Sequence, residues 1–182
     1  MKKILLINLL FLSFLMKGQN EASVEKSIYS FQIGTVGAWF QNETKLTNTI
    51  ALRTEIGLYT EIWAGSGFFM APEITLEPRW YYNIIKRDKK NINVSNNSAN
   101  FLTIRTSYRS SIFEISTLNN NLAENSISII PKWGIKRNLG KNFNYELGLG
   151  IGYLHFIDQQ YFTLADSDGI IIDAHFRIGY NF

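Results

Sequence analysis

The sequence predicts an all-β protein, namely an antiparallel up-and-down transmembrane β-barrel. Three observations predict this fold class: the chain ends in a segment that alternates between apolar and polar side chains, six earlier segments repeat the alternation, and the N-terminus resembles a secretion signal. A period of two residues is that of a β-strand. A strand that is apolar on one face only can cross a bilayer as part of a closed barrel.

Residues 1–18 have the layout of a secretory signal peptide. Two lysines precede an apolar run from Ile4 to Met16, which is shorter than the roughly 20 residues of a membrane-spanning helix. Cleavage is expected after Gly18, which leaves residues 19–182 as one barrel domain. The alternative interpretation of the run is a buried or membrane-anchoring helix.

The charge balance gives no argument for nucleic acid as a partner. The chain holds 18 basic and 15 acidic residues and no cysteine. Lys2, Lys3 and Lys17 lie in the leader, which has no acidic residue, so 15 residues of each sign remain after it. Because cysteine is missing, we expect no disulfide, no thiolate metal site and no cysteine-linked lipid.

Seven segments are predicted as strands because each sets apolar side chains on one face against polar, charged or glycine residues on the other. Each is long enough to cross a bilayer, for which roughly 9–11 residues suffice. In chain order, the segments and their apolar faces are 27–41 (Tyr29, Phe31, Ile33, Trp39), 47–63 (Ile50, Leu52, Ile56, Leu58, Ile62), 70–85 (Ile74, Leu76, Trp80, Tyr82, Ile84), 99–115 (Leu102, Ile104, Tyr108, Ile112), 126–138 (Ile127, Ile129, Trp133, Ile135), 143–156 (Phe143, Tyr145, Leu147, Leu149, Ile151, Tyr153) and 170–182 (Ile170, Ile172, Ala174, Phe176, Ile178, Tyr180, Phe182).

The connectors between these segments consist of residues that are typical of turns. They are residues 42–45, 65–67, 119–121, 140–142 and 166–169. Seven strands conflict with barrel closure, because single-chain bacterial barrels have an even number and an open edge in lipid leaves backbone groups unpaired. We therefore predict eight strands, the first being formed by residues 19–26 or hidden within a segment that merges two strands.

The polar faces are predicted to fill the lumen with ion pairs, because buried charges are tolerated only when they are paired. A barrel of about eight strands is just wide enough for side chains to fill it. The predicted lumen network comprises Arg53, Glu55, Glu61, Glu73, Glu77, Arg79, Arg105, Arg109, Lys132, Lys136, Glu146, Asp173, His175 and Arg177. Glycines 148, 150 and 152 are expected to make room for long side chains from across the lumen.

The outward faces carry two further signals. The last strand ends on an apolar face that is typical of a membrane-insertion signal, formed by Phe176, Ile178, Tyr180 and Phe182. Aromatic residues near strand ends predict a girdle at the membrane interfaces, or else ordinary strand packing; they are Trp39, Trp63, Trp80, Tyr82, Trp133 and Tyr153. A basic cluster at residues 86–90 is expected to be a solvated turn, or to contact lipid phosphates or cell-wall components.

No catalytic, cofactor or metal site is predicted. The chain has two histidines, His155 and His175, and lacks a G-x-S-x-G nucleophile motif. Asp173 and His175 could in principle belong to a hydrolytic triad, but an ion-pair role fits their inward register better.

The chain resembles the small outer-membrane β-barrel proteins of Bacteroidetes bacteria, of the OmpA-like barrel type. The residues that carry this resemblance are Ile50 to Leu58, the E-P-R-W-Y-Y-N run at 77–83, Trp133 to Phe143 and Arg177 to Phe182. The resemblance implies the fold and a location in the outer membrane of a Gram-negative bacterium. It implies no shared catalytic residue or ligand.

Three functions are consistent with the sequence. The first is a non-enzymatic integral outer-membrane barrel with a side-chain-filled lumen and a structural or adhesion-like role. It would be a monomer in contact with outer-membrane lipid, and would need periplasmic chaperones and the barrel-assembly machinery for insertion. The second is an outer-membrane barrel enzyme acting on lipid or peptide, and the third is a soluble, secreted lipocalin-like barrel that binds a ligand.

Overall fold

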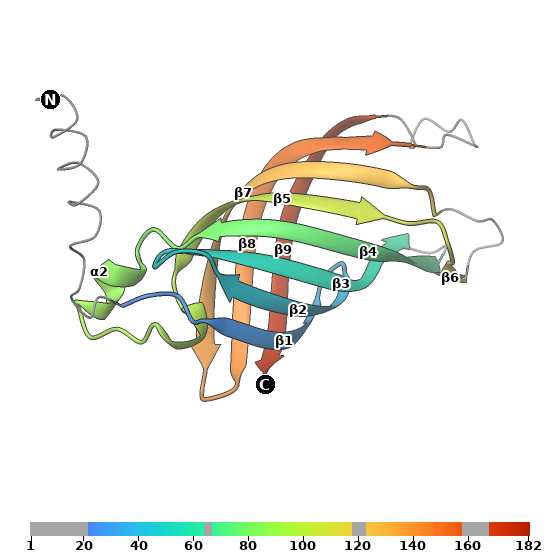
Figure 1. The fold of residues 1–182 in the computed structure, drawn as a ribbon. Coiled ribbons are helices and arrows are strands. Elements are labelled where there is room, and N and C mark those ends of the chain that lie inside the picture. The colour runs from blue at the N-terminus through green and yellow to red at the C-terminus, as the bar shows by residue number, and fades with distance from the viewer. Residues whose placement is uncertain (1–21, 64–66, 118–122, 158–167) are drawn as a thin grey trace, which may run out of the picture.

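Eight antiparallel strands close into a barrel (Figure 1). The computed structural model describes residues 22–63, 67–117, 123–157 and 168–182. The barrel strands are β1 (Ser27–Gly34), β2 (Gly37–Lys45), β3 (Ile50–Trp63), β4 (Gly67–Trp80), β5 (Asn100–Arg109), β7 (Ser126–Leu139), β8 (Phe143–Phe156) and β9 (Gly169–Asn181). A ninth strand, β6 (Ile115–Ser116), pairs only with β4 and lies outside the barrel. The predicted all-β, antiparallel, eight-strand architecture is confirmed.

Closure depends on the pairing of the first strand with the last. β1 and β9 are antiparallel, with Phe31 opposite Tyr180 and Ile33 opposite Ile178. The backbone N–H of Phe182 extends this ladder by donating to the carbonyl oxygen of Tyr29. The C-terminus therefore lies beside the start of β1 (Figure 1).

The missing eighth strand was hidden in the segment 27–41, which is two strands joined by a turn at residues 35–36. The prediction of one strand there, and of a connector at 42–45, is wrong. Partners in a pair share a face, and Ile33 pairs with Ala38 across the turn. The outward register thus changes from odd to even numbers, and Trp39 points into the lumen instead of joining the apolar face.

The turn at residues 35–36 requires a glycine at its end. Gly37 has a φ of 141°, and a Cβ atom there would lie 2.1 Å from the carbonyl oxygen of Leu58. We expect Gly37→Ala to lower the free energy of unfolding by about 1–3 kcal/mol, because it adds a steric clash to backbone strain. Urea unfolding of the refolded barrel measures this loss.

The matched control for this change is Gly140→Ala in the turn between β7 and β8. Gly140 also has a positive φ, 67°, but a Cβ atom added there would have no other atom within 4 Å. We expect a loss of only about 1 kcal/mol there, from backbone strain alone. Equal losses at the two glycines would contradict the steric role of Gly37.

Several predicted strand ends also differ from the structure. β4 begins at Gly67 and ends at Trp80, and β5 ends at Arg109, so Ile84 and Ile112 are not strand residues. The connector at 140–142 is a turn. The predicted connector 119–121, most of 65–67 and part of 166–169 lie outside the described residues, as does the predicted signal peptide.

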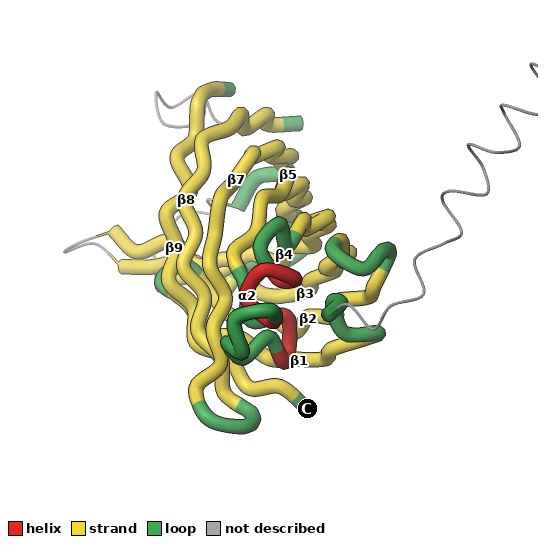
Figure 2. The backbone as a smooth tube through the Cα atoms, turned by 90° about the vertical axis from the view of Figure 1, so that its left-hand side faces the viewer, coloured by secondary structure: helices red, strands yellow, loops and turns green. Residues whose placement is uncertain are grey.

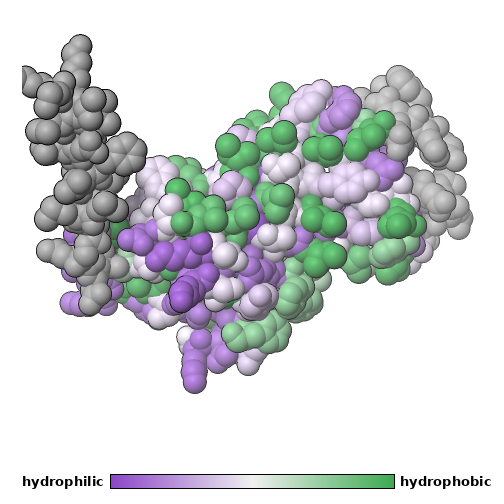
Figure 3. Space-filling view, viewed as in Figure 1, coloured by the Kyte–Doolittle hydropathy of each residue, from purple (hydrophilic) through white to green (hydrophobic). Residues whose placement is uncertain are grey.

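The sides of the sheet are sorted by polarity. The outward side chains of the strands are apolar and exposed, with Leu149 and Ile151 at 59% and Ile172 at 70%, whereas inward charged residues such as Arg53 and Glu146 are fully buried. Figure 3 shows the apolar side chains gathered over the strands, and hydrophilic ones toward the end that carries α2 (Ile84–Asp88).

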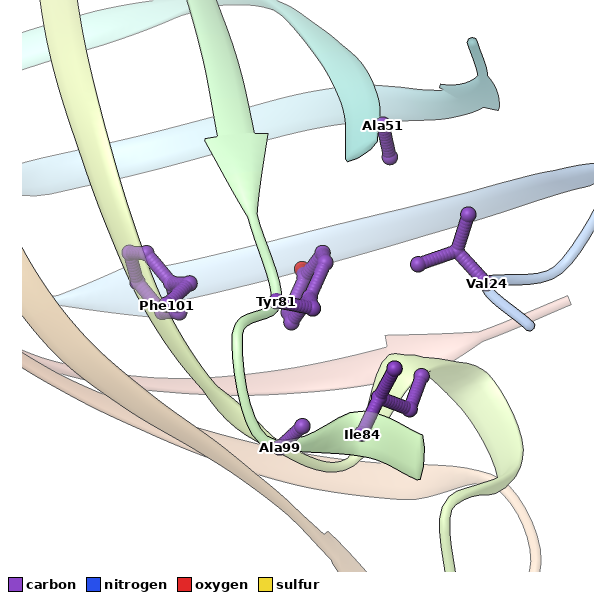
Figure 4. Close-up of a cluster of buried hydrophobic side chains, with 6 residues drawn as sticks. All are labelled: Val24, Ala51, Tyr81, Ile84, Ala99 and Phe101. Atoms are coloured by element: carbon purple, nitrogen blue, oxygen red, sulfur yellow. The ribbon is translucent and has the colours of Figure 1, made fainter. Parts of the chain in front are cut away.

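A plug covers one end of the barrel. Residues 81–99, which include α2 and the short 3-10 helix η1 (Ser95–Asn97), lie across the opening of the ring of strands in Figure 2. A small apolar cluster joins this segment to the neighbouring strands (Figure 4), and it is formed by Val24, Ala51, Tyr81, Ile84, Ala99 and Phe101. Both the start of β1 and the C-terminus lie at this plugged end.

Candidate functional site: the charged lumen

The predicted lumen residues lie on the inner wall of the barrel, because each belongs to the inward register of its strand. Eleven of the fourteen are buried. They are Arg53, Glu55, Glu73, Glu77, Arg79, Arg105, Lys132, Lys136, Glu146, His175 and Arg177. Asp173 is nearly so, with 14% of its side chain exposed. Glu61 and Arg109 lie half-buried toward the end of the barrel opposite the plug.

Glu146 on β8 is the centre of the network near the plug. Its Oε2 accepts hydrogen bonds from Arg53 Nη2 and Arg79 Nη1, both at 2.7 Å. Its Oε1 accepts a third from Arg79 Nη2 at 2.7 Å and a longer one from Arg53 Nη1 at 3.2 Å. One carboxylate therefore joins two guanidinium groups from β3 and β4, on the far side of the barrel from its own strand.

Glu43 is a second centre, and the sequence reasoning missed it because it placed residues 42–45 in a turn. Its Oε1 accepts hydrogen bonds from Arg53 Nε at 3.0 Å and from Lys136 Nζ at 3.1 Å. The sequence did contain a signal for it: Trp39, Gln41 and Glu43 alternate in the inward register once a turn is placed at residues 35–36.

Glu43 also anchors the plug. Its Oε2 accepts hydrogen bonds from the hydroxyl of Tyr81 at 2.9 Å and from Asn97 Nδ2 at 2.7 Å. Burial, and then the negative charge of Glu43, hold the pKa of the Tyr81 phenol well above its usual range. The phenol therefore stays protonated, and a donor, at ordinary pH.

Removing the Tyr81 hydroxyl should loosen the plug. Tyr81→Phe leaves one oxygen of a buried carboxylate with one donor fewer, which costs about 1–3 kcal/mol. We expect trypsin to cleave the plug faster after Lys86, Arg87, Lys89 and Lys90, with the barrel strands still protected. Tyr29→Phe, on the exposed outer face of β1, is the control, and equal cleavage in the two variants would contradict the anchor.

A second group of charges lies further from the plug. Arg105 on β5 is paired with Glu73 on β4. Lys132 on β7 donates to Asp173 Oδ2 at 3.0 Å, and its Nζ lies 2.9 Å from His175 Nδ1. Near the first group, Arg177 Nη1 donates to Glu55 Oε1 at 2.8 Å, which links β9 with β3.

The buried charges balance. The number of basic groups equals the number of carboxylates. The basic groups are those of Arg53, Arg79, Arg105, Lys132, Lys136 and Arg177, and the carboxylates are those of Glu43, Glu55, Glu73, Glu77, Glu146 and Asp173.

Three arginines also stack on aromatic rings inside the barrel. Arg177 lies 3.8 Å from the Trp39 ring, Arg79 lies 4.0 Å from Phe101 and Arg109 lies 3.5 Å from Tyr59.

The inward glycines of β8 make room for side chains of the neighbouring strands, not for residues across the lumen as predicted. A Cβ atom on Gly148 would lie 2.3 Å from Cε1 of His175 on β9, and one on Gly150 would lie 2.2 Å from Cγ of Lys132 on β7. These are register neighbours. The glycines thus let basic side chains lie flat against the wall.

His175 has both ring nitrogens engaged. Nδ1 lies 3.1 Å from Asp173 Oδ1 and also contacts Lys132, while Nε2 lies 3.3 Å from Glu146 Oε1. His155, on the outer face of β8, is exposed and pairs with Asp168 at 2.6 Å. Among the described residues, no group of three or more His, Asp or Glu side chains is arranged to hold a metal ion.

Most of the residues predicted to face outward do so in the structure. Phe176, Ile178, Tyr180 and Phe182 point outward, and Tyr180 packs against Phe143 and Phe182 with ring centroids 5.2 and 5.6 Å apart. Trp80, Tyr82, Trp133 and Tyr153 are exposed on the outside, whereas Trp39 is buried in the lumen, so its assignment to the girdle is wrong. The side chain of Trp63 lies outside what the structure describes.

In the described part of the chain, no helix is long and apolar enough to span a membrane. No family model and no curated protein matches the chain.

Proposed function

We propose that the chain is a non-enzymatic integral protein of the bacterial outer membrane, with a structural or adhesion-like role. The observation that carries the proposal is the polarity of the two faces: the outward strand residues are apolar and exposed, and the inward ones are charged and paired. Such a distribution is stable where the outside is hydrocarbon. In water, the same outer face would be a far larger exposed apolar surface than monomers usually carry.

The contents of the lumen support a structural role over transport. Its ion pairs connect opposite walls, since Arg53 on β3 reaches Glu146 on β8 and Arg105 on β5 lies 3.8 Å from Asp173 on β9. A β-barrel with a water-filled channel needs about 16 strands. Side chains that connect the walls through the lumen stiffen the barrel and occupy the path that a solute would take.

The surroundings of His175 support a non-enzymatic role. A general base needs a free ring nitrogen within reach of the group that it deprotonates, and both nitrogens of His175 already contact charged side chains of the network. The competing barrel-enzyme hypothesis predicts hydrolysis of phospholipid or peptide by the purified barrel, with the activity lost in His175→Ala.

In the proposed role, the barrel is a monomer that contacts outer-membrane lipid. During insertion it would pass from periplasmic chaperones to the barrel-assembly machinery, with the outward face of Phe176, Ile178, Tyr180 and Phe182 as its signal. Because the number of strands is even, the first and the last strand place the two termini of the barrel at the same opening. That plugged opening would face the periplasm.

Membrane fractionation followed by heat-modifiable gel migration tests the proposal. We expect the protein in the outer-membrane fraction, with faster migration in unboiled samples because the folded barrel resists the detergent. Recovery of a folded protein only from the soluble periplasmic fraction would overturn the proposal in favour of the lipocalin-like alternative. Ligand binding by that soluble protein would then be measured.

A further inference from the structure

The two ends of the barrel differ in charge. At the plugged end, the described residues include eight basic side chains and two acidic ones. The basic ones are Lys26, Lys45, Lys86, Arg87, Lys89, Lys90, Arg137 and Lys141, and the acidic ones are Glu25 and Asp88. At the opposite end the described charges are mostly acidic, namely Glu61, Glu114, Glu124 and Asp168 against Arg109.

One of these basic residues, Arg137, lies on the outside of the barrel beside exposed aromatic side chains. Arg137 is in the outward register of β7, four residues after Trp133. Arg87 belongs to α2 of the plug, and the two guanidinium groups are close enough for their charges to repel each other. Both guanidinium groups donate hydrogen bonds to neutral acceptors: Arg87 Nη2 donates to the carbonyl oxygen of Asn93 at 3.2 Å, and Arg137 donates to Lys136 and Asn100. Two neighbouring like charges repel each other, so an anion between them would be stabilised.

The hydrogen bonds around Arg137 leave donors free to face outward. Its Nη1 donates to the carbonyl oxygen of Lys136 at 2.8 Å, and its Nη2 donates to Asn100 Oδ1 at 2.5 Å. Both acceptors are neutral, and a guanidinium has five N–H donors. Arg137 is thus held in place by neutral groups and keeps its charge and further N–H groups for a ligand.

The hydroxyl of Tyr82 adds a third donor at the same place. Its oxygen accepts hydrogen bonds from Trp133 Nε1 at 2.9 Å and from Asn100 Nδ2 at 3.2 Å. With its oxygen used as an acceptor twice, the hydroxyl proton is left to donate outward. Trp80 lies next to Tyr82, with ring centroids 6.1 Å apart, and both rings are exposed.

We propose that Tyr82, Arg87 and Arg137, together called the rim site, bind the phosphate of an anionic phospholipid in the membrane leaflet nearest the plugged end. The proposal rests on the proposed membrane location. Exposed Trp and Tyr rings are typical of the headgroup level of a bilayer, and guanidinium groups are well suited to phosphate. The aromatic rings would lie against the acyl–glycerol region while the three donors hold the phosphate.

The test compares lipid binding of the full-length folded barrel in detergent by native mass spectrometry, with phosphatidylglycerol and phosphatidylcholine as probes. We expect the wild type to retain phosphatidylglycerol preferentially. Arg87→Gln/Arg137→Gln should weaken that preference on the order of tenfold or more, from about 1 kcal/mol per basic residue. The control Lys26→Gln/Lys141→Gln removes the same charge from exposed positions at the same end, and should retain the preference.

Any other outcome would overturn the proposed rim site. Wild-type binding by Arg87→Gln/Arg137→Gln, or equal losses in the two double variants, would mean that no local site exists. Displacement of phosphatidylglycerol by millimolar inorganic phosphate would assign the site to the free anion. Heat-modifiable migration is measured on the same samples: its absence counts against the membrane barrel, whereas a folded barrel without lipid preference counts against the rim site alone.

Discussion

Replacing Glu146 by glutamine is expected to lower the free energy of unfolding by about 3–5 kcal/mol, the cost of breaking a buried ion pair on one side. Glutamine has nearly the same shape, so the change removes charge and little volume. Arg53 and Arg79 would lose the carboxylate that lies between them, and the lumen would carry an excess positive charge. Urea unfolding of the barrel in lipid vesicles measures the loss.

Two comparisons separate charge imbalance from the general effects of substitution. Glu25→Gln removes an exposed carboxylate near the plug and should change the stability by less than about 0.5 kcal/mol. Arg53→Met combined with Glu146→Gln restores the charge balance and should recover part of the loss, as buried ion pairs can be replaced by apolar groups. A double variant with fully additive losses would contradict the network.

Replacing Leu149 by arginine is expected to cost about 2–4 kcal/mol in a bilayer, the range for arginine on the lipid face at the midplane of a barrel. Leu149 is 59% exposed on the outer face, and it lies mid-strand, paired with Trp133 and Ala174. Unfolding in lipid vesicles measures this cost. An exposed position of a water-soluble barrel would instead change by about 0.5 kcal/mol or less.

The control for Leu149→Arg is the same substitution at a strand end. Leu139 is the last residue of β7 and is exposed on the outside. Arginine there should cost about 0–1 kcal/mol, because the side chain reaches the interface. A small and equal effect at both positions would argue against a bilayer around the strands.

The sequence predicts strands well here because each one separates two environments. In β9, the polar register of Asp173, His175 and Arg177 and the apolar register of Phe176 and Ile178 are visible without any partner strand. The same alternation fails where a turn lacks the usual residues. Thr35 and Val36 are poor turn residues, so the sequence predicts one strand in place of β1 and β2, and Trp39 and Glu43 are misplaced.

The plug was less predictable than the strands. Ile84 continues the apolar alternation of β4, yet it begins α2 and is buried against Tyr81 and Ala99. The residues that pack around Ile84 come from four separate parts of the chain. No local sequence pattern predicts that these parts are in contact. The role of Tyr81 and Asn97 as hydrogen-bond donors to the Glu43 carboxylate could not be predicted for the same reason.

The sequence alone predicted the barrel class, the inward register of the charges outside the first two strands and, from the need for closure, an even strand number. A two-residue period and the need to pair every backbone group are local or general constraints. Only the tertiary structure decided which charges pair. Arg53 and Glu146 are separated by 93 positions, and Arg177 and Glu55 by 122. Whether they come into contact depends on how far each of the eight strands is shifted relative to its neighbour. The position of one residue relative to the other is fixed only when the register of every strand pair between them is known.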